Sequence, residues 1–256
     1  MESGKFKSFL KKYFFKNEFE EIEKLKEENR ALKKENKKLK ILNSSKDELI
    51  SAISHEFKNP ISIINGYIET ILNTSLPPNL EQKFLNKIQK NTLRLSTLID
   101  RLYLITRLEN EKVKVKFSKF DLCDAAKNII ESFNSDRIIL NCQKTPVFAD
   151  KTLIETVIYN LISNALKYSK DEVTVNINDN FEVIDKGKGI DEKEIHLITH
   201  KFYRIAKNDW DNSLGLGLAI VEKILKIHKT QLQIESKKGK GSRFYFDITS
   251  LKSKEP

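Results

Sequence analysis

The chain has few of the features that mark exported or membrane-spanning proteins. It contains only two cysteines, Cys123 and Cys142, which are too few for a disulfide framework and show no metal-ligand spacing with the four histidines. No apolar run approaches the roughly 20 residues that span a bilayer, and the charged segment 1–12 lacks the apolar stretch of a secretory signal. We therefore expect a reducing, cytoplasmic setting and no integral membrane segment.

Basic residues outnumber acidic ones. Lys and Arg total 46 against 36 Asp and Glu, and the net charge of +10 suits acidic partners such as nucleotides, nucleic acid or anionic lipid. Such an excess more often only solvates the surface, so the charge alone assigns no partner. The 256 residues suffice for one large or two modest domains.

Segment 1–17 is predicted to be a basic amphipathic helix. Its aromatic residues and a leucine recur at helical spacing between Phe6 and Phe14, and lysines fill most of the other face. This pattern suits the headgroup region of an anionic membrane, and it also suits packing against a second copy. Two interpretations stay open: peripheral contact with the inner face of the membrane through residues 1–16, or a dimer contact.

Segment 18–45 is predicted to form a parallel two-stranded coiled coil, and hence a homodimer. Leucines occupy the d positions and asparagines most of the a positions of its heptads (Ile22, Leu25, Asn29, Leu32, Asn36, Leu39, Asn43). Basic residues before a leucine heptad also occur in DNA-binding zippers. Here Phe14, Phe15 and Phe19, together with three Glu, precede the heptads, so we expect no nucleic-acid partner.

The remaining chain is predicted to fold as two domains. Residues 46–110 have the pattern of an antiparallel helical hairpin with a turn at Ser75–Asn79 and a second helix at Leu80–Glu109, and two copies would close a four-helix bundle. Residues 113–250 alternate short strands and helices, which predicts an α+β sandwich of one sheet with helices on it. The expected strands are Val113–Phe117, Arg137–Asn141, Val173–Asn178, Phe181–Asp185, Gln231–Ser236 and Ser242–Ile248, and the expected helices are Leu122–Phe133, Leu153–Tyr168 and Leu216–Ile227.

The first cluster with chemical potential lies in the hairpin. His55 is followed by Glu56, which could orient the imidazole ring and accept its proton, so that the ring could act as a nucleophile. Asn59 lies one turn further on the same face, where an amide could position a water. A lone histidine on a polar helix face is usually without function, so this cluster needs support from elsewhere in the chain.

Two further clusters lie in the α+β region. Asn160, Asn164, Lys167 and Tyr168 share one side of a helix, where amide oxygens suit Mg²⁺ and a lysine suits a phosphate. Asp185 ends a strand and could accept a hydrogen bond from an exocyclic amine. The glycines that follow would let the backbone approach a base or expose N–H groups to phosphate oxygens (Gly187, Gly189, Gly215, Gly217).

In this order and at these separations, the clusters resemble the core of sensor histidine kinases of two-component systems. In that family a histidine-bearing dimerisation domain precedes an ATP-binding domain of the Bergerat type, which gyrase and heat-shock chaperones share. The resemblance covers about Ser44 to Ile248 and implies an ATP-dependent protein histidine kinase. It implies that His55 accepts the phosphoryl group with Glu56 as base, passes it to an aspartate of a response regulator, and that Asn59 supports dephosphorylation of that partner.

The resemblance also implies roles in the nucleotide site. Asn164 would bind Mg²⁺ with Asn160 near it, and Asp185 would read the adenine amino group. Lys167, Tyr168, Gly215 and Gly217 would contact the phosphates, and Gly187 and Gly189 would line the base pocket. Arg204 would lie at the edge of a flexible lid over the site, residues 205–212.

In related ATPases the position of Asn160 is occupied by a glutamate that takes a proton from the attacking water. An amide cannot accept this proton, so the site resembles one that transfers the phosphoryl group to His55 and not to water. The alternatives are a catalytically inactive scaffold, against which the intact His55, Asn164 and Asp185 argue, and an ATP-hydrolysing chaperone-like protein, which would not need the helix that bears His55.

Overall fold

The computed structural model describes residues 24–26, 29–30, 32–33, 50–51, 53–110, 113–203, 205 and 215–252, in two units that divide between residues 54 and 55. All described residues of the first unit are helical. The predicted amphipathic helix 1–17 and most of the predicted coiled coil 18–45 lie outside the described residues. Within the described ranges, no helix is both long and apolar enough to cross a bilayer.

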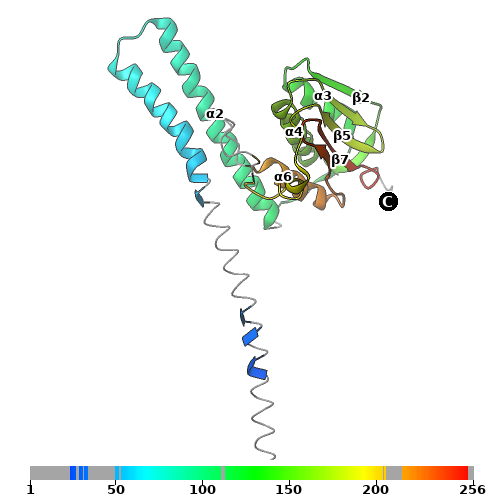
Figure 1. Cartoon of the computed structure of the whole chain (residues 1–256). Coiled ribbons are helices and arrows are strands. Elements are labelled where there is room, and N and C mark those ends of the chain that lie inside the picture. Colours follow the sequence, from blue (N-terminus) through cyan, green and yellow to red (C-terminus); the bar gives the residue numbers. More distant parts are fainter. Residues whose placement is uncertain are drawn as a thin grey trace, which may run out of the picture. The chain divides into compact units, whose positions relative to one another are not determined.

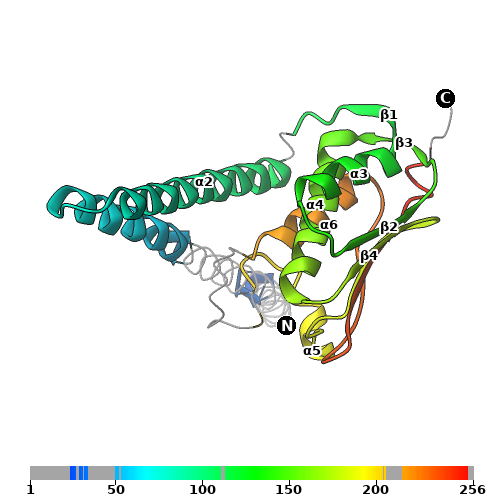
Figure 2. The same cartoon turned by 90° about the horizontal axis from the view of Figure 1, so that it is seen from above.

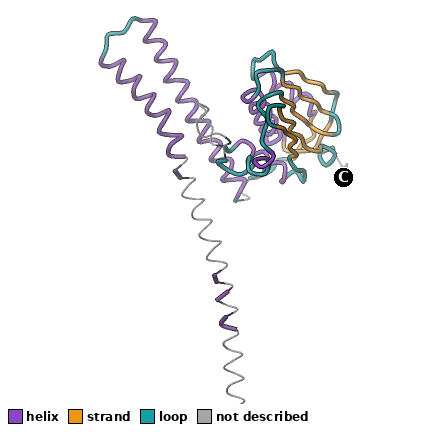
Figure 3. Tube along the Cα trace, in the orientation of Figure 1, coloured by secondary structure: helices purple, strands orange, loops and turns teal. Residues whose placement is uncertain are grey.

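Two antiparallel helices form the predicted hairpin (Figure 3). The first runs to residue 73, residues 74–77 make the turn, and helix α2 spans Pro78–Glu109. Proline is tolerated in the first turn of α2 because the backbone N–H that it lacks would have no partner inside the helix. The rings of Tyr67 and Phe84 pack between the two helices with centroids 4.8 Å apart.

The remaining residues of the second unit form an α+β fold, as predicted. Its elements in chain order are β1 (Phe117–Asp121), α3 (Leu122–Ser132), β2 (Ile138–Cys142), β3 (Pro146–Asp150), α4 (Lys151–Tyr168), β4 (Val173–Ile177), β5 (Asn180–Asp185), α5 (Glu192–Ile195), α6 (Gly217–Ile227), β6 (Gln233–Lys237) and β7 (Gly241–Asp247).

Five strands form the main sheet in the order β2-β4-β5-β7-β6, with β2 and β4 parallel and the other neighbours antiparallel. Helices α3, α4 and α6 cover one face of this sheet (Figures 1 and 2). The core lies between them, where alternate residues of β4 and β5 are buried against α4. Asp150 caps α4 by accepting a hydrogen bond from the N–H of Leu153, which fixes where the helix begins.

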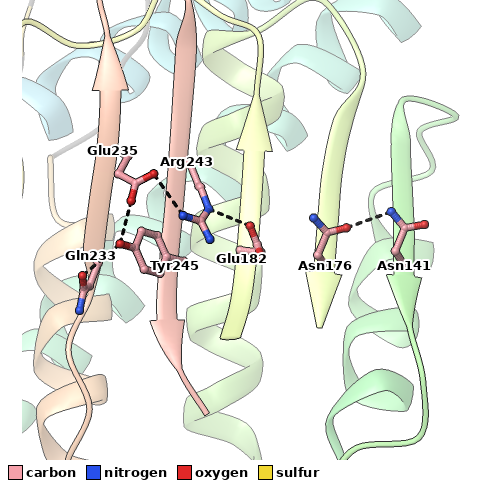
Figure 4. A network of polar contacts seen from close by, with 7 residues as sticks. All are labelled: Asn141, Asn176, Glu182, Gln233, Glu235, Arg243 and Tyr245. Atoms are coloured by element: carbon pink, nitrogen blue, oxygen red, sulfur yellow. Dashed lines mark hydrogen bonds and ion pairs between the residues drawn. The ribbon is translucent and has the colours of Figure 1, made fainter. Parts of the chain in front are cut away.

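The opposite face of the sheet carries a row of polar side chains (Figure 4). The guanidinium of Arg243 donates to Glu182 on one neighbouring strand at 2.8 Å and to Glu235 on the other at 3.1 Å. Both carboxylates favour the charged guanidinium, so the pKa of Arg243 is raised, with the Glu182 hydrogen bond as the main cause. This ladder pairs β5, β7 and β6 across the open face.

The structure differs from the predicted strand pattern at the start of the domain. The predicted strand Val113–Phe117 lies later, at β1, and β3 was not predicted. These two strands pair with each other in a separate two-stranded sheet, so the prediction of a single sheet was incomplete. Strand β3 begins with Pro146, and a proline argues against a strand when only the sequence is considered.

Cys123 and Cys142 form a disulfide that joins α3 to the end of β2, with Cα atoms 5.8 Å apart. The expectation of a reducing setting, drawn from the small number of cysteines, did not include this pairing. The count of cysteines could not reveal it, because a disulfide requires two Cα atoms at such a distance in space and the two residues are 19 apart in the chain.

Candidate functional site

Helix α4 carries the asparagines predicted to bind metal. Asn160 is buried, and its amide nitrogen donates to the carbonyl oxygen of Thr156 at 2.8 Å. This bond leaves the amide oxygen as the group that faces Gly217, where an added Cβ would lie 3.0 Å from it. Asn164 lies one turn further along and is half-buried. The sequence therefore presents two amide groups on the side of α4 that faces the start of α6.

Asp185 ends β5 and is buried in the sheet. One oxygen of its carboxylate accepts a hydrogen bond from the N–H of Gly187 at 2.8 Å. Burial raises the pKa of this carboxyl group, while the N–H groups of Gly187 and Ser242 and the hydroxyl of Ser242 lower it. The ordered N–H and O–H donors keep an acceptor in place at the strand end despite burial.

The glycines around Asp185 let the backbone segments approach closely. A Cβ on Gly187 would lie 2.2 Å from the carbonyl oxygen of Tyr168, and a Cβ on Gly189 would lie 2.1 Å from that of Lys237. Gly189 also has a φ of +61°, which favours glycine. These contacts bring the loop after β5 against both the end of α4 and the end of β6.

A cavity of about 280 Å³ collects most of the predicted residues. The predicted residues that line it are Asn160, Asn164, Lys167, Tyr168, Asp185, Gly189, Gly215 and Gly217. Gly187 supports the wall through its contact with Tyr168, and is not one of the residues that line the cavity. Segments far apart in the sequence therefore converge on one space, among them α4, the end of β5, the start of α6 and strand β7.

The cavity also has walls that the sequence analysis missed. Ser242 and Phe244 of β7 line it, as do the apolar side chains of Ile190 and Ile198 and the ring of Tyr203. Ile190 and Tyr203 belong to the segments 185–190 and 202–204 that the sequence pattern singles out, although no role was predicted for them. Ser242, Phe244 and Ile198 belong to no motif, and only the register of the sheet, which sets Ser242 directly opposite Asp185, could have pointed to one of them. The apolar members supply surface against which a planar ring can pack.

The predicted acceptor cluster lies on the first hairpin helix. His55 and Asn59 are exposed on its surface, one turn apart. Glu56 is buried instead, and its carboxylate pairs with the guanidinium of Arg94 on α2 at 3.3 Å. Arg94 was not predicted, because a partner on the neighbouring helix cannot be read from the sequence of the first. Arg204, by contrast, lies outside the described residues.

The residues present fit a magnesium nucleotide. The cavity offers a buried carboxylate beside glycine backbone for a base, and amide oxygens and a lysine for a metal and phosphates. Two cations lie over the ring of Tyr168, with Lys167 Nζ 4.6 Å and Lys188 Nζ 4.8 Å from its centroid. Within the described part of the chain, no cluster of three or more His, Cys, Asp or Glu side chains could hold a metal. The amide oxygens of Asn160 and Asn164 are of the type that Mg²⁺ accepts as ligands beside phosphate oxygens.

Two family models match the chain. The model of histidine kinase-, DNA gyrase B-, and HSP90-like ATPases matches residues 149–252, and the model of the His Kinase A (phospho-acceptor) domain matches residues 45–111. The first match contains α4, Asp185 and the glycine segments, and the second contains His55. The two functional clusters described above therefore fall in separate, successive matches.

Several curated proteins are similar over most of this chain. The phosphate regulon sensor protein PhoR of Haemophilus influenzae is 29% identical over 226 residues, which cover 81% of this chain and 52% of that protein. The sensor protein RprX of Bacteroides fragilis is 28% identical over 233 residues, covering 83% and 45%. The chain thus spans about half the length of the curated relatives it matches.

Solved structures share the fold. The Acinetobacter baumannii histidine kinase AdeS superposes with a TM-score of 0.59 at 23% identity, covering 78% of this chain and 98% of that one. Histidine kinase ThkA, solved in complex with response regulator protein TrrA, gives a TM-score of 0.56 at 25% identity, covering 80% and 61%.

Proposed function

Because this chain belongs to the sensor histidine kinases of two-component systems, we propose that it phosphorylates itself on His55 with ATP and passes the phosphoryl group to an aspartate of a response regulator. The observation that carries the proposal is the cavity in which Asn160, Asn164 and Asp185 come together, within a chain that also presents an exposed His55. The proposed domains are the basic amphipathic helix 1–17, the parallel coiled coil 18–45, the dimerisation and histidine phosphotransfer hairpin 46–110 and the ATP-binding domain 113–250.

In this proposal each residue of the cavity has one task. Asp185 accepts a hydrogen bond from the adenine amino group beside Gly187 and Gly189, and Asn164 holds Mg²⁺ with Asn160 near it. Lys167, Tyr168, Gly215 and Gly217 contact the phosphates, and Arg204 lies at the lid edge. Bound Mg²⁺ would neutralise phosphate charge. Asn160 cannot act as a base towards water, which favours transfer to a protein group over hydrolysis.

His55 supplies the nucleophile. A neutral imidazole nitrogen forms the bond to the γ-phosphorus while the bond from that phosphorus to the bridging oxygen breaks and ADP leaves. Glu56 takes up the proton from the ring. Its pairing with Arg94 holds the carboxylate in a fixed position next to His55 in the chain.

The partners follow from the same proposal. The complex of histidine kinase ThkA with response regulator protein TrrA supports a response regulator as the acceptor. Asn59, exposed one turn from His55, then supports dephosphorylation of that regulator by positioning a water. A homodimer forms through the hairpins, which close a four-helix bundle, and through the coiled coil.

The test uses γ-labelled ATP, Mg²⁺ and three purified proteins: the wild type, His55→Gln and Asn164→Ala. We expect acid-labile label on the wild type only. His55→Gln should still bind ATP, since it keeps the cavity, while Asn164→Ala should lose label by roughly a hundredfold or more, as expected when an orienting group for the metal and phosphates is removed. Acid-labile label that persists on His55→Gln would exclude this residue as the acceptor.

For residues 1–16 we propose contact with an anionic membrane surface, which would place this kinase in the cytoplasm at the inner face of the membrane. Flotation with anionic liposomes should carry the full chain and leave a variant lacking residues 1–16 behind. Equal flotation of both proteins would instead favour the dimer contact.

A further inference from the structure

Three side chains stand opposite one another across neighbouring strands at the base of the cavity. In the register of the sheet, Asp185 of β5 faces Ser242 of β7, and Ser242 faces Ser236 of β6. The hydroxyl oxygens of Ser236 and Ser242 are 2.9 Å apart, and the Ser242 hydroxyl also bonds the Asp185 carboxyl group. The three therefore form a continuous polar ladder from the edge strand to the buried carboxylate.

Ser236 also holds the loop that follows Asp185. Its hydroxyl oxygen accepts a hydrogen bond from the N–H of Ile190 at 2.9 Å, and its single proton is shared between the carbonyl oxygen of Gly241, 2.8 Å away, and the hydroxyl oxygen of Ser242. The N–H of Gly187, at the other side of the same loop, donates to Asp185. Both ends of the loop are thus attached to the ladder.

The backbone around the ladder has little room to adjust. Gly241 has a φ of +93°, and a Cβ there would lie 1.9 Å from the carbonyl oxygen of Asp185. Gly189 is in similarly close contact with the backbone at Lys237. Because these segments touch backbone to backbone, the loop and the strand ends that carry Ser236, Ser242 and Asp185 have little room to move independently.

We propose that Ser236 is a positioning residue of the nucleotide site, which acts through Ser242 and the Ile190 N–H to hold the Asp185 carboxylate and its loop in the geometry that receives adenine. This inference rests on the proposed function, in which Asp185 reads the adenine amino group. Ser236 itself lies behind the cavity wall and does not line the cavity.

The test compares Ser236→Ala with Ser236→Thr in the full chain. We measure the Kd of a fluorescent ATP analogue together with KM for ATP and kcat of autophosphorylation. Ser236→Ala should raise Kd and KM about three- to tenfold, as expected for the loss of one or two hydrogen bonds, and leave kcat within about twofold. Ser236→Thr keeps the hydroxyl on a β-branched side chain that suits a strand, so it should bind nearly as the wild type does.

The matched control is Ser132→Ala, which removes an exposed hydroxyl that bonds only within its own helix, to the carbonyl of Ile129. Its Kd should not change. The thermal midpoint of each variant is recorded so that binding is compared well below unfolding. If Ser236→Thr binds as weakly as Ser236→Ala, or if kcat falls along with an unchanged KM, Ser236 does not position the nucleotide site.

A double-mutant cycle with Ser242→Ala tests the route of the effect. If Ser236 acts in part through Ser242, the double variant should lose less ATP affinity than the sum of the two single losses, with the remainder due to the Ile190 N–H, and fully additive losses would overturn the route through Ser242. Asp185→Asn separates the two proposals. Loss of binding in Asp185→Asn with wild-type binding in Ser236→Ala refutes only the positioning role, whereas wild-type binding in Asp185→Asn refutes the adenine contact and the inference with it.

Discussion

Two glycines near the loop after β5 differ in whether an added methyl group would meet fixed backbone, and only one of them, Gly189, lines the nucleotide cavity. Gly189 and Gly239 both adopt a positive φ, at +61° and +78°. They differ in their surroundings, because a Cβ on Gly189 would meet the Lys237 carbonyl at 2.1 Å, whereas a Cβ on Gly239 would meet nothing within 4 Å. The chain therefore offers a pair of positions with the same backbone demand and opposite steric consequences.

We predict that Gly189→Ala weakens ATP binding and that Gly239→Ala does not. Both substitutions place an alanine in the left-handed region, which destabilises each variant by about 1–2 kcal/mol. Only Gly189→Ala displaces the loop from β6, and a displacement worth about 1.4 kcal/mol would raise the Kd of a fluorescent ATP analogue roughly tenfold. Similar Kd values for the two variants would show that backbone strain alone, without the steric contact, governs this site.

Site residues that belong to motifs could be predicted from the sequence, whereas site residues whose role comes only from their neighbours across the sheet could not. Asn160, Asn164 and Asp185 carry side chains whose chemistry suits their place in a recognisable order, and the structure brings them to one cavity. Ser236 and Ser242 are ordinary strand serines whose importance comes from cross-strand register. The register that sets Ser242 opposite Asp185 pairs segments far apart in the chain, which local sequence does not encode, whereas the turn of the β6–β7 hairpin sets Ser236 opposite Ser242.

At the scale of elements, His228 joins the end of α6 to the start of α4. Its Nε2 accepts a hydrogen bond from the N–H of Asp150 at 3.1 Å, while Nδ1 lies 2.8 Å from the carbonyl oxygen of Ile224 and must donate to it. The neutral ring thus satisfies both neighbours, and a protonated ring would lose the bond from Asp150. Burial lowers the pKa of His228, against the Ile224 carbonyl and the Asp150 charge, which raise it.

We predict that the buried, neutral ring of His228 makes the free energy of unfolding decrease as the pH decreases below about 6.5, the ordinary histidine pKa. In that range the unfolded chain binds a proton at this position, whereas the folded chain binds it only below its lowered pKa, so the unfolded state is favoured as the pH decreases. Urea unfolding at about pH 7.5 and pH 5.5 measures the effect. His228→Gln, which does not titrate, should show a smaller loss of stability over the same range.

The control for this prediction is His196→Gln, which removes an exposed histidine and should keep the pH dependence of the wild type. An equal loss of stability in His228→Gln and the wild type would mean that other groups cause the pH dependence.

Element boundaries show which physical signals the sequence carries. The helix predicted from Leu153 begins two residues earlier, at Lys151, because the Asp150 side chain caps it. The cap was visible in the sequence as an aspartate before an apolar run. Strand β3 gave no such signal, since it depends on pairing with β1, and α5 is only four residues long. Long periodic helices were predicted well because their own packing pattern defines them.

At the scale of the whole molecule, the hairpin exposes apolar side chains that a second copy would cover. On the first helix Ile61, Ile68 and Leu72 follow one another at spacings of seven and four residues, and Leu72 is 77% exposed in the single chain. On α2 a second stripe contains Leu85, Ile99 and Tyr103. Both stripes lie away from the side on which the two helices pack, as a four-helix bundle formed by two chains requires.

We predict that Ile99→Lys converts the proposed dimer into monomer and that Leu93→Lys does not. The two residues have similar exposures in the single chain, 55% and 63%, but Leu93 projects about a quarter turn away from the stripe. Each copy would lose about 1.5–3 kcal/mol of apolar burial at Ile99, and the two-fold symmetry of a dimer doubles this loss. Light scattering across a dilution series measures the mass. The comparison uses residues 46–256, because in the full chain the coiled coil would still link two copies. A dimer of unchanged affinity in Ile99→Lys would show that this stripe is not the contact between the hairpins.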